Sequence, residues 1–159
     1  MHTITLRKPL AHPWQDMFAL VLDIERYPQF VPGCARVQVL QRHHPDNGPI
    51  EIVSRMTVGV LPLQIGYTNV TRADRTERWI SVDSTDGPMR HLHALWRFDP
   101  LEPRSTRVSF GVSYDFRNPV IARLASGAFE SMFARIIDAF EHRADRMAAA
   151  GRPAHHSTE

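Results

Sequence analysis

The chain has little of what most metal and catalytic sites are built from. Cys34 is the only cysteine among 159 residues. An internal disulfide and a zinc site made from cysteine pairs are therefore excluded, and a reducing cytoplasm is the expected compartment. The sequence also lacks a glycine-rich phosphate loop and the motifs G-x-S-x-G and H-E-x-x-H. A buried, structural thiol is the expected role of Cys34.

Long hydrophobic runs and strong charge of one sign are missing too. The sequence contains no run of about 18 apolar residues, the length needed to cross a bilayer as a helix. The formal net charge is only +2, although the isoelectric point is about 9.1. Arg72, Arg75 and Arg78 cluster in the sequence, but Asp74 and Glu77 lie among them. DNA is therefore not an expected partner.

Histidines and acids occur in pairs that suit structural roles better than chemistry. His91 and His93 alternate on one strand face, but that face is expected to be solvated and offers no third metal ligand. The acids Asp83 and Asp86 lie near the end of an element, where carboxylates commonly serve turns and caps. We predict no catalytic residue, no metal site and no cofactor.

The segment from Asn118 to Gly151 carries apolar residues at helical spacing around more than half its circumference. Asn118 can cap a helix, Pro119 suits its first turn, and Gly151 can end it. The segment predicts one long helix, about 45 Å in length at 1.5 Å per residue. Such a helix needs a wide, curved partner.

The rest of the chain reads as strands with two short helices near its start. A strand is expected at 3–7, and a helix from Trp14 to about Ile24. The proline-braced stretch 23–34 allows only a short helical turn. Between 35 and 116 the apolar period becomes two and predicts six strands. The clearest cases have one apolar face each, formed by Leu61, Leu63, Ile65 and Tyr67, by Leu92, Ala94, Trp96 and Phe98, and by Val108, Phe110, Val112, Tyr114 and Phe116.

Short turns and half-polar strands indicate an antiparallel sheet with one solvated face. The predicted fold is α+β: a seven-stranded antiparallel sheet wrapped around the long C-terminal helix, with two short helices after the first strand. One domain is expected over 1–150, followed by a disordered tail over 151–159.

Aromatic side chains converge between the predicted sheet and helix. They form either a filled core or a core with a cavity near one end, because a curved sheet over a single helix tends to leave room there. The hydroxyls of Tyr67 and Tyr114 and the indole N–H of Trp96 would need partners if buried.

Several motifs, in order along nearly the whole chain, resemble one family. They are Asp23-Ile-Glu-x-Tyr-Pro-x-Phe-Val-Pro-Gly-Cys34, Tyr67-Thr-Asn-Val, Asp86-Gly-Pro-Met-Arg-x-Leu92, Trp96-Arg-Phe98 and Ala139-Phe-x-x-Arg-Ala144. Together they resemble the coenzyme Q-binding, START-like family, which includes the ribosome association toxin RatA and belongs to the polyketide cyclase/dehydrase superfamily. The resemblance implies a helix-grip fold and a deep apolar tunnel whose mouth lies near Tyr27 to Pro32.

Three functions follow from this resemblance. The first is non-enzymatic binding or chaperoning of ubiquinone or a similar prenyl lipid, supporting respiration from the cytoplasm with peripheral contact to the respiratory membrane. The second is a RatA-like protein that binds the large ribosomal subunit and blocks subunit association. The third, an aromatase/cyclase, would need polar residues inside the tunnel. The predicted ligand-binding residues are Tyr27, Phe30, Val31, Pro32, Met56, Ile65, Tyr67, Trp96, Phe98, Phe110, Tyr114, Phe129, Met132, Phe133 and Ile136.

Overall fold

The structure is a computed structural model that describes residues 1–60 and 63–151. Leu61 and Pro62, and the predicted tail at 152–159, lie outside the described residues. The elements in chain order are β1 (His2–Leu10), α1 (Trp14–Leu22), the 3-10 helix η1 (Ile24–Gln29), β2 (Cys34–His43), β3 (Ile50–Val60), β4 (Leu63–Asp74), β5 (Trp79–Ser84), β6 (Met89–Glu102), β7 (Ser105–Phe116), α2 (Pro119–Ala134) and α3 (Ile136–Ala149).

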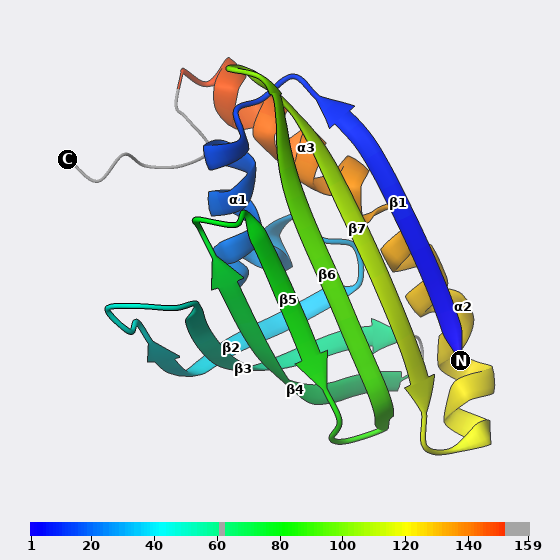
Figure 1. Ribbon diagram of the computed structural model, residues 1–159. Helices are drawn as coiled ribbons and strands as arrows, with labels where there is room; N and C mark the ends of the chain where they lie inside the picture. The colour runs from blue at the N-terminus through cyan, green and yellow to red at the C-terminus, as the bar shows by residue number, and fades with distance from the viewer. Residues whose placement is uncertain (61–62, 152–159) are drawn as a thin grey trace.

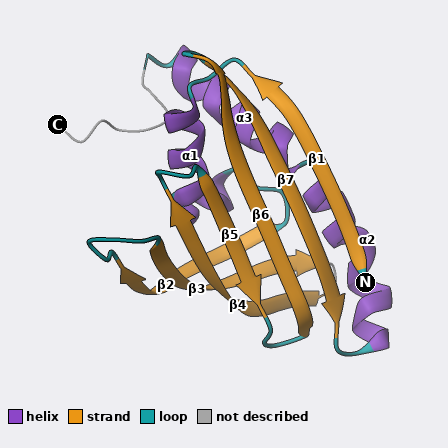
Figure 2. Cartoon of the chain, viewed as in Figure 1, coloured by secondary structure: helices purple, strands orange, loops and turns teal. Residues whose placement is uncertain are grey.

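The seven strands form one antiparallel sheet in the order β1-β7-β6-β5-β4-β3-β2. Figure 1 shows α2 and α3 lying one after the other along the same face of this sheet, near β1 and β7. In Figure 2 the strands β2 and β3 run across the long strands β6 and β7, so the sheet curls around the helices. The predicted helix-grip fold is confirmed.

Alternation of apolar and polar residues decides which strand face is buried. In β6 and β7 the register joins Leu92 to Tyr114 and Trp96 to Phe110, and all four residues are at most 3% exposed. The intervening residues are exposed or half-buried. This pattern confirms the predicted buried faces of the two strands. It arises because a period of two places every second side chain on the helix side of the sheet.

The strand β1 is longer than predicted. It continues past Arg7 to Leu10 and includes Pro9, which lies opposite Arg107 in the register. A proline cannot donate to a neighbouring strand, but β1 is an edge strand with only one neighbour, where proline is tolerated. The helix α1 ends at Leu22 and not at the predicted Ile24.

The prediction of one continuous C-terminal helix was wrong. The winding stops at Arg135, whose backbone has φ −105° and ψ 6° and whose N–H donates to the carbonyl oxygens of Met132 and Phe133. The first turn is built as predicted, since the Asn118 side chain accepts a hydrogen bond from the N–H of Val120. Two shorter helices follow the curved sheet, where one straight helix would leave it. No helix among the described residues has the length and apolarity needed to cross a membrane.

Candidate functional site

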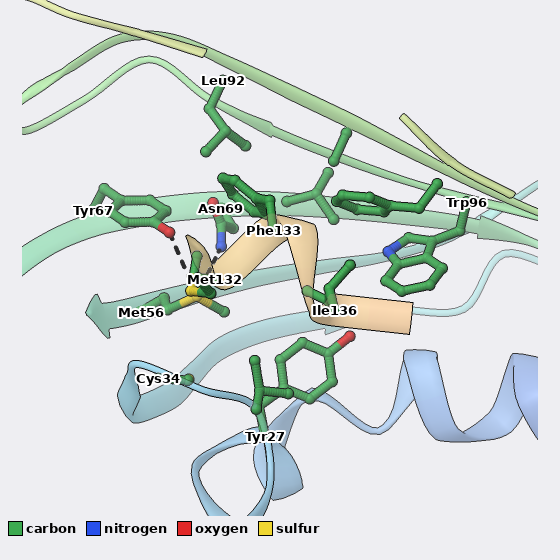
Figure 3. Close-up of a pocket in the computed structure, with 14 residues that line it drawn as sticks. Tyr27, Cys34, Met56, Tyr67, Asn69, Leu92, Trp96, Met132, Phe133 and Ile136 are labelled. Carbon is green, nitrogen blue, oxygen red and sulfur yellow. Dashed lines mark hydrogen bonds between the residues drawn. The ribbon is translucent and has the colours of Figure 1, made fainter. Parts of the chain in front are cut away.

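A cavity of about 60 Å³ lies between the sheet and the junction of α2 with α3 (Figure 3). The strands supply one wall, the helical residues Met132, Phe133 and Ile136 supply another, and the segment around η1 closes the third side. Fourteen residues line it: Tyr27, Val31, Cys34, Met56, Tyr67, Asn69, Val82, Leu92, Ala94, Trp96, Phe110, Met132, Phe133 and Ile136. None of these side chains is acidic, basic or an imidazole, so the cavity wall is uncharged, and most of it is apolar.

Two polar side chains from β4 project into the cavity. Tyr67 and Asn69 are two residues apart, and alternation along the strand therefore turns both inward. The Tyr67 hydroxyl donates to the Met56 sulfur at 3.6 Å, and Nδ2 of Asn69 approaches the same sulfur at 3.9 Å. Burial raises the pKa of Tyr67 above its ordinary value, so this hydroxyl keeps its proton at neutral pH.

Tyr27 and Cys34 close the cavity on the side of η1. The Tyr27 hydroxyl donates to the carbonyl oxygen of Val21, and burial raises the pKa of Tyr27. Burial also raises the pKa of the Cys34 thiol to about 11, which keeps it protonated and poorly nucleophilic. Cys34 is 7% exposed, and the prediction of a buried thiol is confirmed.

The structure places nine of the fifteen predicted residues on the cavity wall. They are Tyr27, Val31, Met56, Tyr67, Trp96, Phe110, Met132, Phe133 and Ile136. Whether these nine contact a ligand stays a prediction.

Six predicted residues pack elsewhere. Phe98 stacks on Trp96 and packs edge-on against Phe18 of α1. These rings fill the space beyond the Trp96 end of the cavity. Tyr114 and Phe129 pack with Phe116 as a solid aromatic cluster.

The other three residues lie near the cavity but not on its wall. Phe30 packs edge-on against Tyr27 and Phe140, with the guanidinium of Arg143 over its ring. Ile65 is buried in the core, and Pro32 is half-buried between η1 and β2.

Five wall residues were not predicted as ligand contacts: Cys34, Asn69, Val82, Leu92 and Ala94. Strand alternation contains the signal for three of them. Asn69 follows Tyr67 by two residues, and Leu92 and Ala94 precede Trp96 by four and two. The prediction selected large apolar or aromatic side chains. It therefore missed the small Ala94 and the amide Asn69, although both face the same side of the sheet as the predicted residues.

The paired histidines lie on the outer face of the sheet, as expected. His91 contacts the Ser113 hydroxyl at 3.2 Å, and Nδ1 of His93 lies 2.6 Å from a carboxylate oxygen of Asp83. Across the described residues, no group of three or more histidine, cysteine or acidic side chains is arranged to hold a metal ion.

A seven-stranded antiparallel sheet closed by C-terminal helices over an apolar cavity defines a START-like, helix-grip domain. Residues 10–141 match the model of one family, described as polyketide cyclase / dehydrase and lipid transport. The chain belongs to this family, and the resemblance identified in the sequence is confirmed.

Two curated relatives are similar over most of this chain. The ribosome association toxin RatA of Escherichia coli K12 is 30% identical over 137 residues, which cover 86% of this chain and 82% of RatA. The mitochondrial coenzyme Q-binding protein COQ10 homolog B of Xenopus laevis is 28% identical over 155 residues, covering 88% of this chain and 57% of that protein.

Solved structures share the same architecture. An 18 kDa protein of Caulobacter crescentus is 29% identical, with a TM-score of 0.73 and coverage of 94% of this chain and 99% of that one. The Zhui aromatase/cyclase from Streptomyces sp. R1128 has a TM-score of 0.80, with coverage of 95% and 98%. At 18% identity, the likeness to Zhui shows the fold alone.

Proposed function

We propose that this protein binds ubiquinone or a similar prenyl lipid in the cavity between sheet and helices, and carries or protects it without reacting with it. The uncharged wall of the cavity is the observation that carries this proposal. Burying hydrocarbon contributes about 0.8 kcal/mol per CH2. Several isoprene units can therefore offset an association cost of roughly 4–15 kcal/mol without any ion pair.

The cavity must widen to admit such a ligand. Its volume of about 60 Å³ is below the roughly 300–1,000 Å³ of a typical ligand site. Two methionines, Met56 and Met132, line it, and unbranched methionine side chains can change shape at low cost. A Cβ placed on Gly33 would lie 3.6 Å from the Met132 sulfur, an ordinary van der Waals distance, so Met132 packs against the segment after η1. Met132 lies three residues before the helix break, where a small movement of α2 opens the space.

The surface of α2 is consistent with peripheral contact with the cytoplasmic face of a respiratory membrane. Val120 and Leu124 lie one helical turn apart and are 63% and 51% exposed. Two exposed apolar side chains on one face give a helix a weak affinity for a lipid surface. A carrier needs only such transient contact to load and release its ligand.

Lipid extraction tests the proposal directly. The full chain is purified without detergent from a host that makes ubiquinone, extracted with organic solvent, and analysed by mass spectrometry. We expect a prenyl quinone or quinol in the wild-type extract and its loss from Ala94→Val, which adds two methyl carbons to the cavity wall. The matched variant Ala35→Val adds the same atoms at an exposed position and should retain the lipid. A lipid-free wild-type protein that also fails to bind added decylubiquinone or decylubiquinol would rule the proposal out.

The similarity to RatA over 82% of that relative favours a second candidate function. In this alternative, the outer surface binds the large ribosomal subunit and blocks subunit association. Sucrose-gradient sedimentation of ribosomes with added protein tests it, and an unchanged profile would exclude it. Because a ribosome would contact the outside of the protein, Ala94→Val should act like the wild type in this assay.

An aromatase or cyclase activity has less support. The cavity wall contains no carboxylate or imidazole to move protons during a cyclisation, and Tyr67 is held protonated by burial.

A further inference from the structure

The side-chain amide of Asn69 is buried in the cavity wall without a full set of partners. Asn69 is 4% exposed, and its Oδ1 has no hydrogen-bond partner among the described residues. Its Nδ2 reaches only the Met56 sulfur, at 3.9 Å, and sulfur is a weak acceptor. Exchanging the two ends of the amide would leave the NH2 group unpaired instead. A buried amide with an unpaired end is costly in an apolar protein interior, and such groups often mark a binding site.

Beside Asn69, the Tyr67 hydroxyl also has only a weak hydrogen-bond partner. It is 2% exposed and donates to the same Met56 sulfur, at 3.6 Å. Figure 3 shows Tyr67 and Asn69 on either side of this sulfur, at the end of the cavity away from Trp96. One strong hydrogen-bond donor with a weak partner and one free acceptor therefore lie in the same part of the cavity wall.

A hydroxyl group satisfies both protein groups at once. Its oxygen accepts from the Tyr67 O–H, while its own hydrogen is donated to Oδ1 of Asn69, and Nδ2 keeps its contact with Met56. A carbonyl oxygen can only accept. To use the amide, a carbonyl needs Nδ2 turned toward it, which leaves Oδ1 facing the sulfur without a donor.

We infer that the cavity selects a ligand whose polar head carries a hydroxyl, such as a hydroquinone or a phenol, over the corresponding quinone. This inference rests on the proposed function for the occupancy of the cavity and adds the chemistry of the head group. The head lies between the Tyr67 hydroxyl and Oδ1 of Asn69, where it takes the Tyr67 hydroxyl from the Met56 sulfur while Nδ2 of Asn69 stays in contact with that sulfur. The apolar tail extends past Ile136 and Trp96.

The test compares three ligands that share one tail: decylubiquinol kept reduced under argon, decylubiquinone, and decylbenzene. Binding to the delipidated full chain is measured by isothermal titration calorimetry. We expect the quinol to bind about tenfold more tightly than the quinone, the size of effect that one additional hydrogen bond gives. A tenfold preference raises the two-electron midpoint potential of the bound quinone by about 30 mV, which a redox titration measures independently.

Two variants separate the roles of the polar groups. Asn69→Leu removes the amide at nearly constant volume and should bring the quinol to the affinity of the quinone, with decylbenzene unchanged. Tyr67→Phe removes a donor that both head groups use, so both affinities should fall while their ratio persists.

The outcomes distinguish this inference from the proposed function. Quinol and quinone binding equally well to the wild type, or the quinone binding better, overturns the inference and leaves lipid binding in place. A quinol preference that survives in Asn69→Leu also overturns it. If none of the three ligands binds, both the inference and the proposed function fail. The wild-type comparison needs no variant, so a folding defect in a mutant does not prevent a decision.

Discussion

Asp86 fastens the turn between β5 and β6 to the neighbouring strand β4. Its carboxylate accepts from the N–H of Thr68 at 2.6 Å and from the Ser84 hydroxyl at 3.4 Å, and it pairs with Arg55 at 3.2 Å. The next residue, Gly87, has φ +60°, and a Cβ there would lie 2.6 Å from the carbonyl oxygen of Gly66. Only glycine fits this close approach of two backbones. The acid expected from the sequence to serve a turn does so.

The pH dependence of stability should report on Asp86. Burial alone would raise the pKa of this carboxyl, but the hydrogen bonds from Thr68 and the charge of Arg55 outweigh it and lower the pKa below the ordinary value of 3.8. A lowered pKa in the folded state means that Asp86 stabilises the protein above pH 3.8, and this contribution is lost as the pH falls through the folded value. Because the side chain is 45% exposed, the contribution is at most about 1 kcal/mol.

We therefore expect Asp86→Asn to lower the free energy of unfolding at pH 7 by at most about 1 kcal/mol and to lessen its decline between pH 5 and pH 2. Urea unfolding at a series of pH values measures both effects. The exposed Asp99→Asn serves as the control. An acid decline as steep in Asp86→Asn as in the wild type would show that Asp86 makes no such contribution.

Single residues also show how far the sequence could define the site. Strand alternation correctly placed Tyr67, Trp96 and Phe110 on the helix side of the sheet. It could not tell how far along a strand the cavity extends, and Phe98, two residues beyond Trp96, does not line the cavity. Asn69 faces the same side of the sheet as Tyr67, but it was not predicted because its side chain is an amide and not apolar.

At the scale of the elements, the strands follow from the sequence and the break in the C-terminal helix does not. Apolar residues continue at helical spacing across Arg135, from Met132 and Phe133 to Ile136 and Ile137. No glycine or proline marks the position. The helices lie against a curved sheet, and that curvature is a property of all seven strands together. Local periodicity therefore predicted the apolar face of the helix but not its interruption.

The helix α3 depends on Phe140, which joins three parts of the fold. Its ring lies 5.0 Å from Phe30, 5.2 Å from Trp96 and 5.4 Å from Tyr27, measured between ring centroids. Phe140 is 1% exposed, so truncation leaves a hole that rigid neighbours cannot fill. We expect Phe140→Ala to lower the free energy of unfolding by about 3–5 kcal/mol.

Urea denaturation followed by circular dichroism measures this loss. Leu124→Ala removes a large side chain that is 51% exposed on α2 and should change stability by less than about 0.5 kcal/mol. Equal losses in the two variants would contradict the central position of Phe140.

At the scale of the whole molecule, the interior is divided between solid packing and a hollow. The hollow lies between the aromatic cluster of Tyr114, Phe116 and Phe129 and the packing of Phe98 on Phe18. Protein interiors are otherwise close-packed, and an empty space forfeits contacts that the surrounding atoms could make. The same hollow that could admit a ligand therefore weakens the ligand-free protein.

A larger side chain in the cavity should abolish ligand binding and raise the stability of the ligand-free protein. A cavity of about 60 Å³, at roughly 24 cal/mol per Å³, accounts for about 1.4 kcal/mol of lost stability. We expect delipidated Ala94→Val to unfold at a higher urea concentration than delipidated wild type by up to this amount, and Ala35→Val to match the wild type. Added decylubiquinol should then stabilise the wild type and Ala35→Val but not Ala94→Val, because only a ligand that binds the folded state raises its stability. If Ala94→Val is less stable than the wild type, the space beside Ala94 is too small for two further carbons, and the ligand must enter through a larger rearrangement of α2.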